Sequence, residues 1–591
     1  MRRKDHFHWV VNYLEIIQSI TDWFDTFGAT LAGPVCTVTR FLFPLLTLWI
    51  LIRCARSLLG GRAQPETWAL LALPGGATIP VTHWENMIGR RKNCDVVIDF
   101  PTVSRAHAVL TRYDDGSWSI RDIGSKGGVA VNGQDVESSE VCYGDVISLG
   151  GVELTLLPLT AEQLAAQENA RPRAGWAVRP GSTLLILMLF QLITAAQLCF
   201  STGAAGKVCA AFGALMAMEW VLFAVLRSLR RTGFDVETVA FYLSTLGLAI
   251  GASDDPDGLL KIVVTMAMGL TLFLILGWML RDLERAKKMR YLAAAAGLAL
   301  LAANLAFGTE LYGAKNWIFI GPISFQPSEL VKICFVFTGA STLDRIVARR
   351  NVALFLVYTG AVCGALALMN DFGTAIVFFA AFLVIAFLRS GSFAGLALIC
   401  AGVAFAGALV LRFRPYALSR FSAWGHVWEN ALSSGYQQTR SMMCIASGGL
   451  FGLGVGNGWL KYVAASDTDL VFAFVGEEWG LLVAVMMVLF VACFGAFTVK
   501  SAAAGRSSFY TIGACAAMCI LMVQAMLNVF GTVDFLPLTG MTFPFVSNGG
   551  SSMISAWGLL AFVKAADTRR SASFAVRQER APEGADEEAA A

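Results

Sequence analysis

The stretch STLLILMLFQLITAAQLCFS, residues 182–201, decides the class of fold. It runs for 20 residues without an Asp, Glu, Lys or Arg, which is the length that a helix needs to cross a bilayer. The whole chain of 591 residues is 56% hydrophobic and 15% charged, with a mean hydropathy of +0.62. Soluble domains carry about 25% charged residues. The sequence therefore predicts a polytopic α-helical membrane protein.

Similar apolar runs on either side of this stretch predict the other spans. They lie at 35–52, 206–226, 236–251, 261–280, 291–308, 329–346, 352–369, 373–389, 392–411, 470–497, 510–530 and 551–566. The basic segments between them, such as RSLRR (227–231) and RDLERAKKMR (281–290), all fall on one side of the predicted topology. An excess of Lys and Arg is typical of cytoplasmic loops. We therefore expect 309–327, 412–469 and 531–550 to be external.

Residues 65–158 have a different character, because short β-rich runs such as WSIRDI (118–123) and DVISLG (145–150) alternate with Gly, Asp and Asn. This spacing predicts a β-sandwich, inserted between two spans and cytoplasmic by the same topology. The expected order is an amphipathic segment and one span over 1–60, the sandwich over 65–158, a linker over 159–181, two extra spans over 182–234, a ten-span core over 235–566 and a disordered cytoplasmic tail over 567–591.

Charge and cysteine content argue against several classes of function. The net charge of +3, with no basic groove, argues against nucleic acid as a partner. Most of the 13 cysteines lie in apolar runs and none forms a CxxC pair, so buried thiols are expected rather than a disulfide framework. None of the five histidines falls in a predicted span, which argues against a histidine metal site or a Ser/His/Asp triad.

The segment IGRRKNCDVVIDFPTVSRAHAVLTRYDDGSWSIRDIGSKGGVAVNG (88–133) resembles a forkhead-associated (FHA) domain. The resemblance implies that loops at one end of a β-sandwich grip phosphothreonine. A dianionic phosphate is held by a guanidinium together with neutral donors. By resemblance, the phosphopeptide-binding residues are Arg90 and Ser104 at the phosphate, with Arg105, Ser125 and Asn132 beside them. The implied partners are a phosphothreonine-bearing protein and a Ser/Thr kinase.

One departure from the FHA pattern concerns the peptide. Family members often have Ser-x-Asn-Gly where this chain has SKGG (125–128), so the Asn that normally holds the peptide backbone is absent. His107 is expected to brace the loop through ring hydrogen bonds rather than to bind ligand. The alternative for the whole module is a docking domain that does not depend on phosphate.

Five ordered motifs resemble the SEDS family, the FtsW/RodA/SpoVE membrane glycosyltransferases. They are GAKNWIFIGPISFQPSELVKI (313–333), NDFGTAIVFF (370–379), SGYQQTRSMMCIASGGLFGLGVGNGWLK (434–461), TDLVFAFVGEEWGL (468–481) and LPLTGMTFPFVSNGGSSMIS (536–555). The resemblance implies polymerisation of lipid II into glycan strands, in cell division or cell-shape control. It also implies a class B penicillin-binding protein, the cross-linking transpeptidase, as partner.

A sugar-pyrophosphate substrate needs polar and cationic groups at the outer ends of spans. Asp371 lies at such an edge, and Glu329 and Lys332 are three residues apart, so they share a helix face. Ionisable residues at membrane depth are costly and usually functional. A structural ion pair between Glu329 and Lys332 is the alternative to a substrate role.

The other predicted substrate-binding residues lie in external loops. Lys315 could meet phosphate or be simply solvated. SNGGSS (547–552) offers the hydroxyls of Ser547 and Ser551 before a helix, either as an anion cradle or as a tight turn. Gln437 and Asp469 complete the predicted set. The sequence shows no closed set of metal ligands. A divalent cation that assists catalysis is the one cofactor that we expect.

The loop WGHVWENALSSGYQQTRS (424–441) carries the candidate catalytic residues. Family members place an Asp five residues before the Gly of GYQ, and here that position is Asn430. Glycosyl transfer needs a base or a stabilising carboxylate, and an amide cannot take a proton at neutral pH. The candidate base is therefore the neighbouring Glu429, or another acid such as Asp469. The alternatives are a non-catalytic scaffold that binds lipid II or a transpeptidase, and a lipid II flippase.

Overall fold

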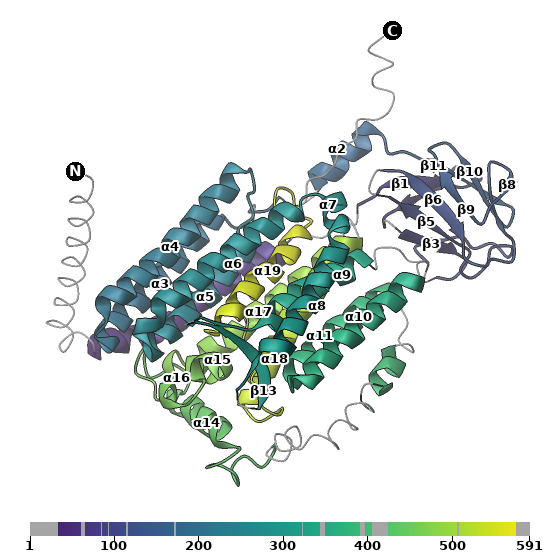
Figure 1. The fold of residues 1–591 in the computed structure, drawn as a ribbon. Coiled ribbons are helices and arrows are strands. Elements are labelled where there is room, and N and C mark those ends of the chain that lie inside the picture. The colour runs from purple at the N-terminus through teal and green to yellow at the C-terminus, as the bar shows by residue number, and fades with distance from the viewer. Residues whose placement is uncertain are drawn as a thin grey trace, which may run out of the picture.

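The computed structural model describes residues 33–574 except 61–65, 84, 93, 114–115, 171–172, 176, 312, 322, 343–348, 391–395, 403, 405–423 and 505–507 (Figure 1). The predicted amphipathic segment 1–32, most of the span predicted at 392–411 and the tail 575–591 lie outside the described residues.

Residues 69–157 form the predicted β-sandwich. One sheet has the strand order β2-β1-β11-β10-β7-β8 and the other β4-β3-β5-β6-β9. Side chains alternate between core and surface, as in β11, and Trp118, Ile120 and Leu154 are buried between the sheets. The strands are β1 Ala69–Ala72, β2 Thr78–Val81, β3 Glu85–Gly89, β4 Val96–Val97, β5 Ala108–Arg112, β6 Trp118–Asp122, β7 Val129–Val131, β8 Gln134–Asp135, β9 Ser138–Val141, β10 Val146–Leu149 and β11 Val152–Leu157.

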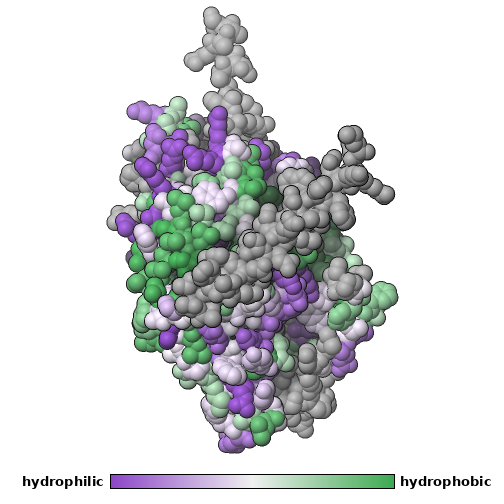
Figure 2. Space-filling view, turned by 90° about the vertical axis from the view of Figure 1, so that its left-hand side faces the viewer, coloured by the Kyte–Doolittle hydropathy of each residue, from purple (hydrophilic) through white to green (hydrophobic). Residues whose placement is uncertain are grey.

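The rest of the described chain is mainly a helical bundle, which confirms the predicted polytopic fold. Eight described helices are long and apolar enough to cross a membrane: Gly33–Leu59, α3 Pro180–Thr202, α4 Ala205–Ser228, α5 Asp235–Asp254, α6 Leu259–Met279, α8 Arg290–Phe307, α17 Leu481–Ala503 and α18 Ser508–Thr532. Further helices of the bundle are α9 Pro327–Thr342, α10 Arg349–Leu368, α11 Phe372–Ser390 and α19 Gly550–Ala565. Hydrophobic residues gather midway along the face in Figure 2, with hydrophilic residues mostly toward its ends.

The two ends of the bundle carry different structures (Figure 1). At one end, here called the FHA end, Gly33–Leu59 leads into the sandwich and α3 leaves it. The opposite end, here called the loop end, carries the small sheet β12–β14 (Thr309–Leu311, Ala314–Ile320 and Ile323–Phe325) and the helices α14 Tyr436–Gly448, α15 Ser466–Asp469 and α16 Val471–Glu478.

The run that the sequence predicts as one span at 470–497 is divided in the structure. Helix α16 ends at Glu478, and α17 begins at Leu481. Gly480 between them has φ +92°, where a Cβ would lie 2.3 Å from the carbonyl oxygen of Leu450. Only glycine takes this conformation so close to another backbone, so the chain turns here, directly after Glu477, Glu478 and Trp479, within a run that is otherwise apolar.

Helix α5 is buried along nearly its whole length, because the extra helices cover it. Hydroxyl groups join Thr47 of the first described helix to Tyr242 of α5 at 3.0 Å. The amide of Gln191 in α3 donates to Thr245 of α5 at 3.1 Å. The segments that precede the predicted ten-span core are therefore attached to it by buried polar contacts as well as by apolar packing.

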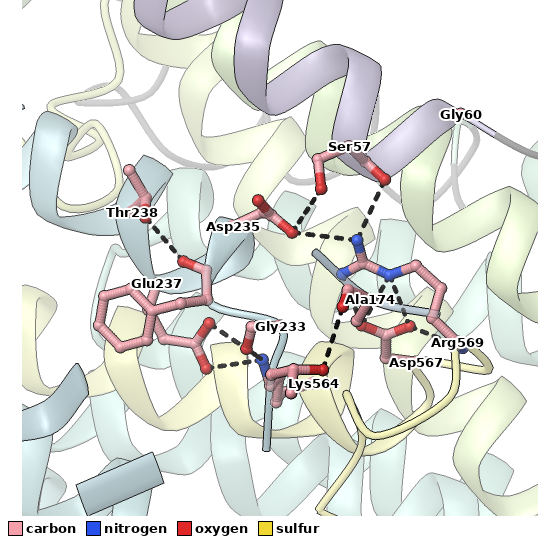
Figure 3. A network of polar contacts seen from close by, with 12 residues as sticks. Ser57, Gly60, Ala174, Gly233, Asp235, Glu237, Thr238, Lys564, Asp567 and Arg569 are labelled. Carbon is pink, nitrogen blue, oxygen red and sulfur yellow. Dashed lines mark hydrogen bonds and ion pairs between the residues drawn. The ribbon is translucent and has the colours of Figure 1, made fainter. Parts of the chain in front are cut away.

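The last turn of α19 and the residues after it form a buried polar network at the FHA end, here called the C-terminal clamp: Lys564, Asp567 and Arg569 with Ser57, Asp235 and Glu237 (Figure 3). Arg569 donates through Nη1 to the carbonyl oxygen of Ser57 and to Asp235, both at 3.1 Å, and through Nη2 to Asp567 at 2.8 Å. Although burial opposes ionisation, Arg569 holds the pKa of Asp567 below its ordinary value.

The clamp contacts the chain on both sides of the sandwich, at Ser57 before it and at Ala174 after it. Lys564 pairs with Glu237 at 2.9 Å and donates to the carbonyl oxygen of Gly233 at 2.7 Å. On the linker that follows the sandwich, the N–H of Ala174 donates to the carbonyl oxygen of Arg570 at 3.1 Å. The predicted tail begins at residue 567, yet Asp567 and Phe574 are buried, so ordered chain continues eight residues beyond that boundary.

Candidate functional site

A buried polar cluster lies at the loop end, where α9, α11 and α19 begin. Helix α9 starts at Pro327, which pre-sets the first turn, and this places Glu329 and Lys332 on one face as their spacing predicts. Lys332 Nζ donates to Glu329 Oε1 at 2.6 Å, and the hydroxyl of Ser555 donates to Glu329 Oε2 at 2.8 Å. Both charged side chains are almost fully buried.

Asp371 belongs to the same cluster. One carboxylate oxygen accepts the N–H of Thr374 at 3.1 Å and so caps α11. The other oxygen, Oδ2, is buried with no hydrogen-bond partner among the described residues. Lys332 and Glu329 are close enough to act electrostatically on this carboxyl group. Here, in the part of the chain that the structure describes, Lys332 has one hydrogen bond, so the cluster retains an unused acceptor and an ammonium with unused donors.

Lys315 lies beside this cluster but is engaged elsewhere. Its Nζ donates to the carbonyl oxygen of Leu305 at 2.6 Å, in the last turn of α8. Its backbone N–H donates to Met369, which precedes α11. This lysine therefore caps a helix C-terminus, which is a favourable place for a cation.

The segment 536–549 connects α18 to the cluster. Ser551 at the start of α19 accepts the N–H of Gln326 at 3.0 Å, directly before α9. Ser547 donates to the carbonyl oxygen of Thr468 at 2.5 Å and accepts the N–H of Phe543. These hydroxyls are buried and used within the fold.

Asp469 ends α15 on the other side of that segment. Asn528 of α18 donates to its backbone oxygen at 2.9 Å, and Gly540 approaches so closely that a Cβ there would lie 3.2 Å from Asp469 Oδ2. Gln437 on α14 donates its amide to the carbonyl oxygen of Ala464 at 2.9 Å. The structure thus joins these two predicted residues to the loops around the cluster.

The candidate catalytic residues lie in the segment before α14. The side chain of Glu429 is 77% exposed, and its carboxylate lies 3.4 Å from His426 Nδ1. The amide of Asn430 donates to the carbonyl oxygen of His426 at 3.2 Å. The described contacts of both residues are thus local, and none of these hydrogen bonds reaches the buried cluster.

A glycine-rich segment, 448–458, encloses two buried acids of α16. Glu478 accepts the N–H groups of Gly456 at 2.9 Å and Gly458 at 3.3 Å, and the hydroxyl of Ser253 at 2.6 Å. Glu477 accepts the N–H of Leu460 at 2.9 Å. Burial raises the pKa of Glu478 to about 7, although the hydrogen bonds from Gly456 and Ser253 lower it. The glycines therefore bind the protein's own carboxylate, which the sequence pattern did not reveal.

In the sandwich, three loops meet around Ser104. The N–H of Arg90 donates to Ser104 O at 3.0 Å, and the N–H of Lys126 donates to Ser104 Oγ at 3.0 Å. His107 is fully buried; its Nδ1 accepts the N–H of Ser104 at 3.0 Å, so its Nε2 donates to Gly128 O at 2.8 Å. Through these two hydrogen bonds, His107 joins Ser104 to Gly128 and holds the two loops in place. The Arg90 side chain is exposed, and its backbone is joined to that of Ser104.

Two other predicted phosphopeptide-binding side chains make contacts within the domain. Ser125 Oγ accepts the N–H of Gly128 at 2.9 Å. Asn132 donates to Asp145 at 2.9 Å and accepts the N–H of Val146 at 2.9 Å, and its hydrogen bond lowers the pKa of Asp145. Arg105 is exposed, and its backbone oxygen accepts the N–H of Arg91.

Ser555 is the contact of the cluster that sequence reasoning missed. A serine in an apolar helix carries no signal by itself, but Ser555 lies four residues after Ser551, on the same face of α19. Among the described residues, no group of three or more His, Cys, Asp or Glu side chains could hold a metal ion. A divalent cation stays a prediction.

Known proteins resemble both parts of the chain. The model of the FtsW/RodA/SpoVE family, described as cell cycle protein, matches residues 249–572, and the FHA-domain model matches residues 86–150. A relative from Tolumonas auensis named "Probable peptidoglycan glycosyltransferase FtsW" is 34% identical over 307 residues, which cover 50% of this chain and 79% of the relative. "Peptidoglycan glycosyltransferase RodA" of Mycobacterium tuberculosis is 30% identical over 339 residues, covering 53% and 71%.

A solved structure described as "Structural coordination of polymerization and crosslinking by a peptidoglycan synthase complex" is 27% identical to this chain. It covers 56% of this chain and 96% of its own, with a TM-score of 0.47.

Proposed function

This chain belongs to the FtsW/RodA/SpoVE family and carries an FHA domain, and from this premise we propose that it polymerises lipid II into glycan strands. Relatives are named peptidoglycan glycosyltransferases, which supports the reaction class. The proposed partner is a class B penicillin-binding protein that cross-links the product, in cell division or cell-shape control. In this proposal the loop end faces the outside of the cell membrane and the FHA end faces the cytoplasm.

One observation carries the proposal: the buried cluster of Glu329, Lys332 and Asp371 keeps unused polar atoms. A buried charge is costly unless it is paired, so a structural network normally satisfies its members. Here Lys332 has donors to spare and Asp371 Oδ2 has no described partner. An ammonium of this kind suits a pyrophosphate, and the nearby hydroxyls and carboxylates suit the hydroxyls of a sugar. The other proposed substrate-binding residues are Lys315, Gln437, Asp469, Ser547 and Ser551.

Glu429 is the proposed base. It is the carboxylate adjacent to Asn430, and its exposure leaves it accessible to an acceptor sugar. His426 at 3.4 Å would steady the carboxylate when protonated. Asn430 keeps its amide on the backbone of His426 and so shapes the turn that presents Glu429. The base would take the proton of the 4-hydroxyl of the acceptor as the pyrophosphate leaves.

The test is polymerisation of labelled lipid II by the purified chain together with its transpeptidase partner. General-base removal typically costs about 10²–10⁴-fold in rate, so glycan ladders should almost vanish in Glu429→Gln. Glu310→Gln is the matched control, because Glu310 is also an exposed acid at the loop end. Ladders of unchanged length and rate in Glu429→Gln would remove Glu429 from the mechanism.

A second candidate function is favoured by Asn430, which has no proton-accepting group at the family's acidic position. It is a non-catalytic scaffold that binds lipid II or the transpeptidase. Absence of ladders from the unmodified chain, together with intact binding of the transpeptidase, would favour the scaffold over the enzyme.

The proposed role of the FHA domain is to recognise phosphothreonine on a substrate of a Ser/Thr kinase. Arg90 and Ser104 would bind the phosphate, with Arg105, Ser125 and Asn132 supporting the site. The exposed guanidinium of Arg90 next to the loop braced by His107 supports this role. Arg90→Ala should abolish binding of phosphothreonine peptides to the full chain. Equal binding by both proteins would remove the phosphate-reading role.

A further inference from the structure

Five exposed cationic side chains surround the Ser104 loop of the sandwich. We call this set the basic rim: Arg90, Arg91, Lys92, Arg105 and Lys126. Three hydrogen bonds hold together the loops that carry them. The carbonyl oxygens of Ser104 and Arg105 accept the N–H groups of Arg90 and Arg91, and Ser104 Oγ accepts the N–H of Lys126. The rim is therefore one surface built from three separate loops.

None of the five rim side chains forms an ion pair within the described part of the chain. The nearby acids have other partners. Asp95 accepts the N–H of Met87 at 2.8 Å and lies 3.6 Å from His83. Asp122 accepts the N–H of Ser125 at 2.9 Å. The rim is thus a concentration of uncompensated positive charge, and such a surface attracts an anionic partner.

Gly127 fixes how this surface can recognise a peptide. A Cβ at this position would lie 2.7 Å from Gly150 Cα and 3.2 Å from the carbonyl oxygen of Thr102. Because the nearest atoms are backbone, they cannot move aside cheaply. This loop therefore excludes any side chain at 127, including the Asn that other FHA domains use to hold the peptide backbone. Recognition beyond the phosphate is left to the charges around it.

We propose that the FHA domain selects phosphothreonine peptides whose flanking residues are acidic, through the basic rim. This inference rests on the proposed phosphothreonine recognition and specifies its ligand. Arg90 and the Ser104 loop take the phosphate, whereas Arg91, Lys92 and Lys126 pair with Asp or Glu on either side of it. Selectivity then depends on charge rather than on a side-chain amide.

A phosphopeptide accounts for the surface better than an anionic lipid headgroup does. The rim surrounds a loop that the ring of His107 holds in place, and in this loop Ser104 Oγ accepts the N–H of Lys126 and has no described acceptor for its own proton. A membrane surface needs only diffuse positive charge, whereas a phosphate on a peptide uses such fixed neutral donors together with the cations.

The experiment measures binding of labelled peptides to the full chain in detergent micelles. One phosphothreonine peptide has acidic flanks, a second has neutral flanks, and a third has the acidic flanks with unphosphorylated threonine. Several rim ion pairs acting together should make the first bind about tenfold tighter than the second. The advantage should shrink between about 0.1 M and about 1 M salt, since the screening length falls from about 10 Å to about 3 Å.

Two variants separate the rim from the phosphate site. The double replacement Arg91→Ala/Lys126→Ala should bring the acidic peptide down to the affinity of the neutral one and leave the neutral phosphopeptide unchanged. Gly127→Asn should weaken both phosphopeptides rather than restore an amide contact, because the loop must open to admit it. Thermal unfolding of each variant shows whether the sandwich remains folded.

Each outcome has one meaning. Equal affinity for acidic and neutral phosphopeptides overturns the inference but leaves phosphothreonine recognition intact. Equal affinity for phosphorylated and unphosphorylated acidic peptides overturns the proposed phosphothreonine recognition as well. Retention of the unlabelled chain on vesicles of anionic phospholipid, lost in Arg91→Ala/Lys126→Ala while peptides fail to bind, assigns the rim to membranes instead. Tighter binding by Gly127→Asn refutes the steric argument.

Discussion

The C-terminal clamp and the buried cluster at the loop end each include a residue of α19, Lys564 and Ser555, yet they differ in how their charges are satisfied. In the clamp, Lys564 has a carboxylate and a carbonyl oxygen, and Arg569 has two carboxylates and a carbonyl oxygen. In the cluster, Lys332 has a single described partner, and Asp371 keeps an oxygen without one. Glu237 Oε1 in the clamp also lacks a hydrogen bond, but it lies 2.9 Å from Lys564 Nζ. The two networks therefore differ in how many partners their cations have, and not in burial.

Breaking the clamp should have the largest effect on stability. Lys564→Met leaves Glu237 buried and uncompensated, which typically costs about 3–5 kcal/mol. We expect this loss in the unfolding free energy of the purified chain, measured by denaturant titration in detergent. A variant as stable as the unmodified chain would mean that the clamp does not hold the FHA end together.

Removing both charges of a pair sharpens the comparison, because neither member of the pair is left without the other. Glu329→Gln/Lys332→Met should keep the chain folded but reduce lipid II polymerisation by about 10²–10³-fold, the effect expected when a fixed charge on the substrate is lost. The matched control is Glu237→Gln/Lys564→Met in the clamp, which should retain activity within a few-fold once folded. Retained activity in the first double variant would make the cluster a structural brace.

Glu478 is intermediate between the clamp and the cluster in how its carboxylate is satisfied, because its hydrogen-bond donors are backbone N–H groups and a hydroxyl rather than a cation. Its pKa is raised from 4.5 to about 7, so the folded chain holds a proton that the unfolded chain releases over this window. Stability should therefore fall as pH rises from about 4.5 to about 7, by on the order of 1–3 kcal/mol. Glu478→Gln should flatten this dependence in unfolding curves at pH 5 and pH 8; an unchanged slope would exclude Glu478 as its source.

Two serine hydroxyls give the smallest and most closely matched test. Ser555 is the described donor to Glu329 Oε2, whereas Asp235 keeps Arg569 when the hydroxyl of Ser57 is removed. Losing one hydrogen bond costs about 0.5–1.5 kcal/mol, and more when a buried acceptor is left bare. Ser555→Ala should therefore destabilise the chain more than Ser57→Ala does. The reverse order in denaturant titrations would contradict the distinction between the open cluster and the closed clamp.

Most of the helical fold could be predicted from sequence, because an apolar run of spanning length has few alternatives in a polytopic chain. The division at Gly480 could not, because the acids Glu477 and Glu478 are only a short interruption of a run that is otherwise apolar. That turn depends on the close approach of Leu450, which is distant in sequence. Alternation likewise predicts the sandwich, whereas the packing of Gly127 against Gly150 is visible only in three dimensions.

The polar residues show the same difference between what local spacing predicts and what only the folded chain brings together. Glu329 and Lys332 could be paired from their spacing, because three residues fix a shared helix face. The members of the clamp appear in sequence only as charges near the ends of predicted spans. Arg569 and Asp235 are 334 positions apart, and no local pattern relates them. The role of the glycine-rich segment was hidden for the same reason, since its carboxylate lies in the following motif.

The clamp also imposes an order on biosynthesis. Arg569 binds Ser57 across 512 positions of the chain, so the first described helix meets this partner only after the intervening residues have been synthesised. At about 5–20 residues per second, that interval lasts roughly 25–100 s. During this time the sandwich folds on connections that are not yet tied to the bundle. A nascent chain that stops before residue 569 therefore keeps Asp235 buried without its guanidinium, and its defect lies 334 positions before the missing residue.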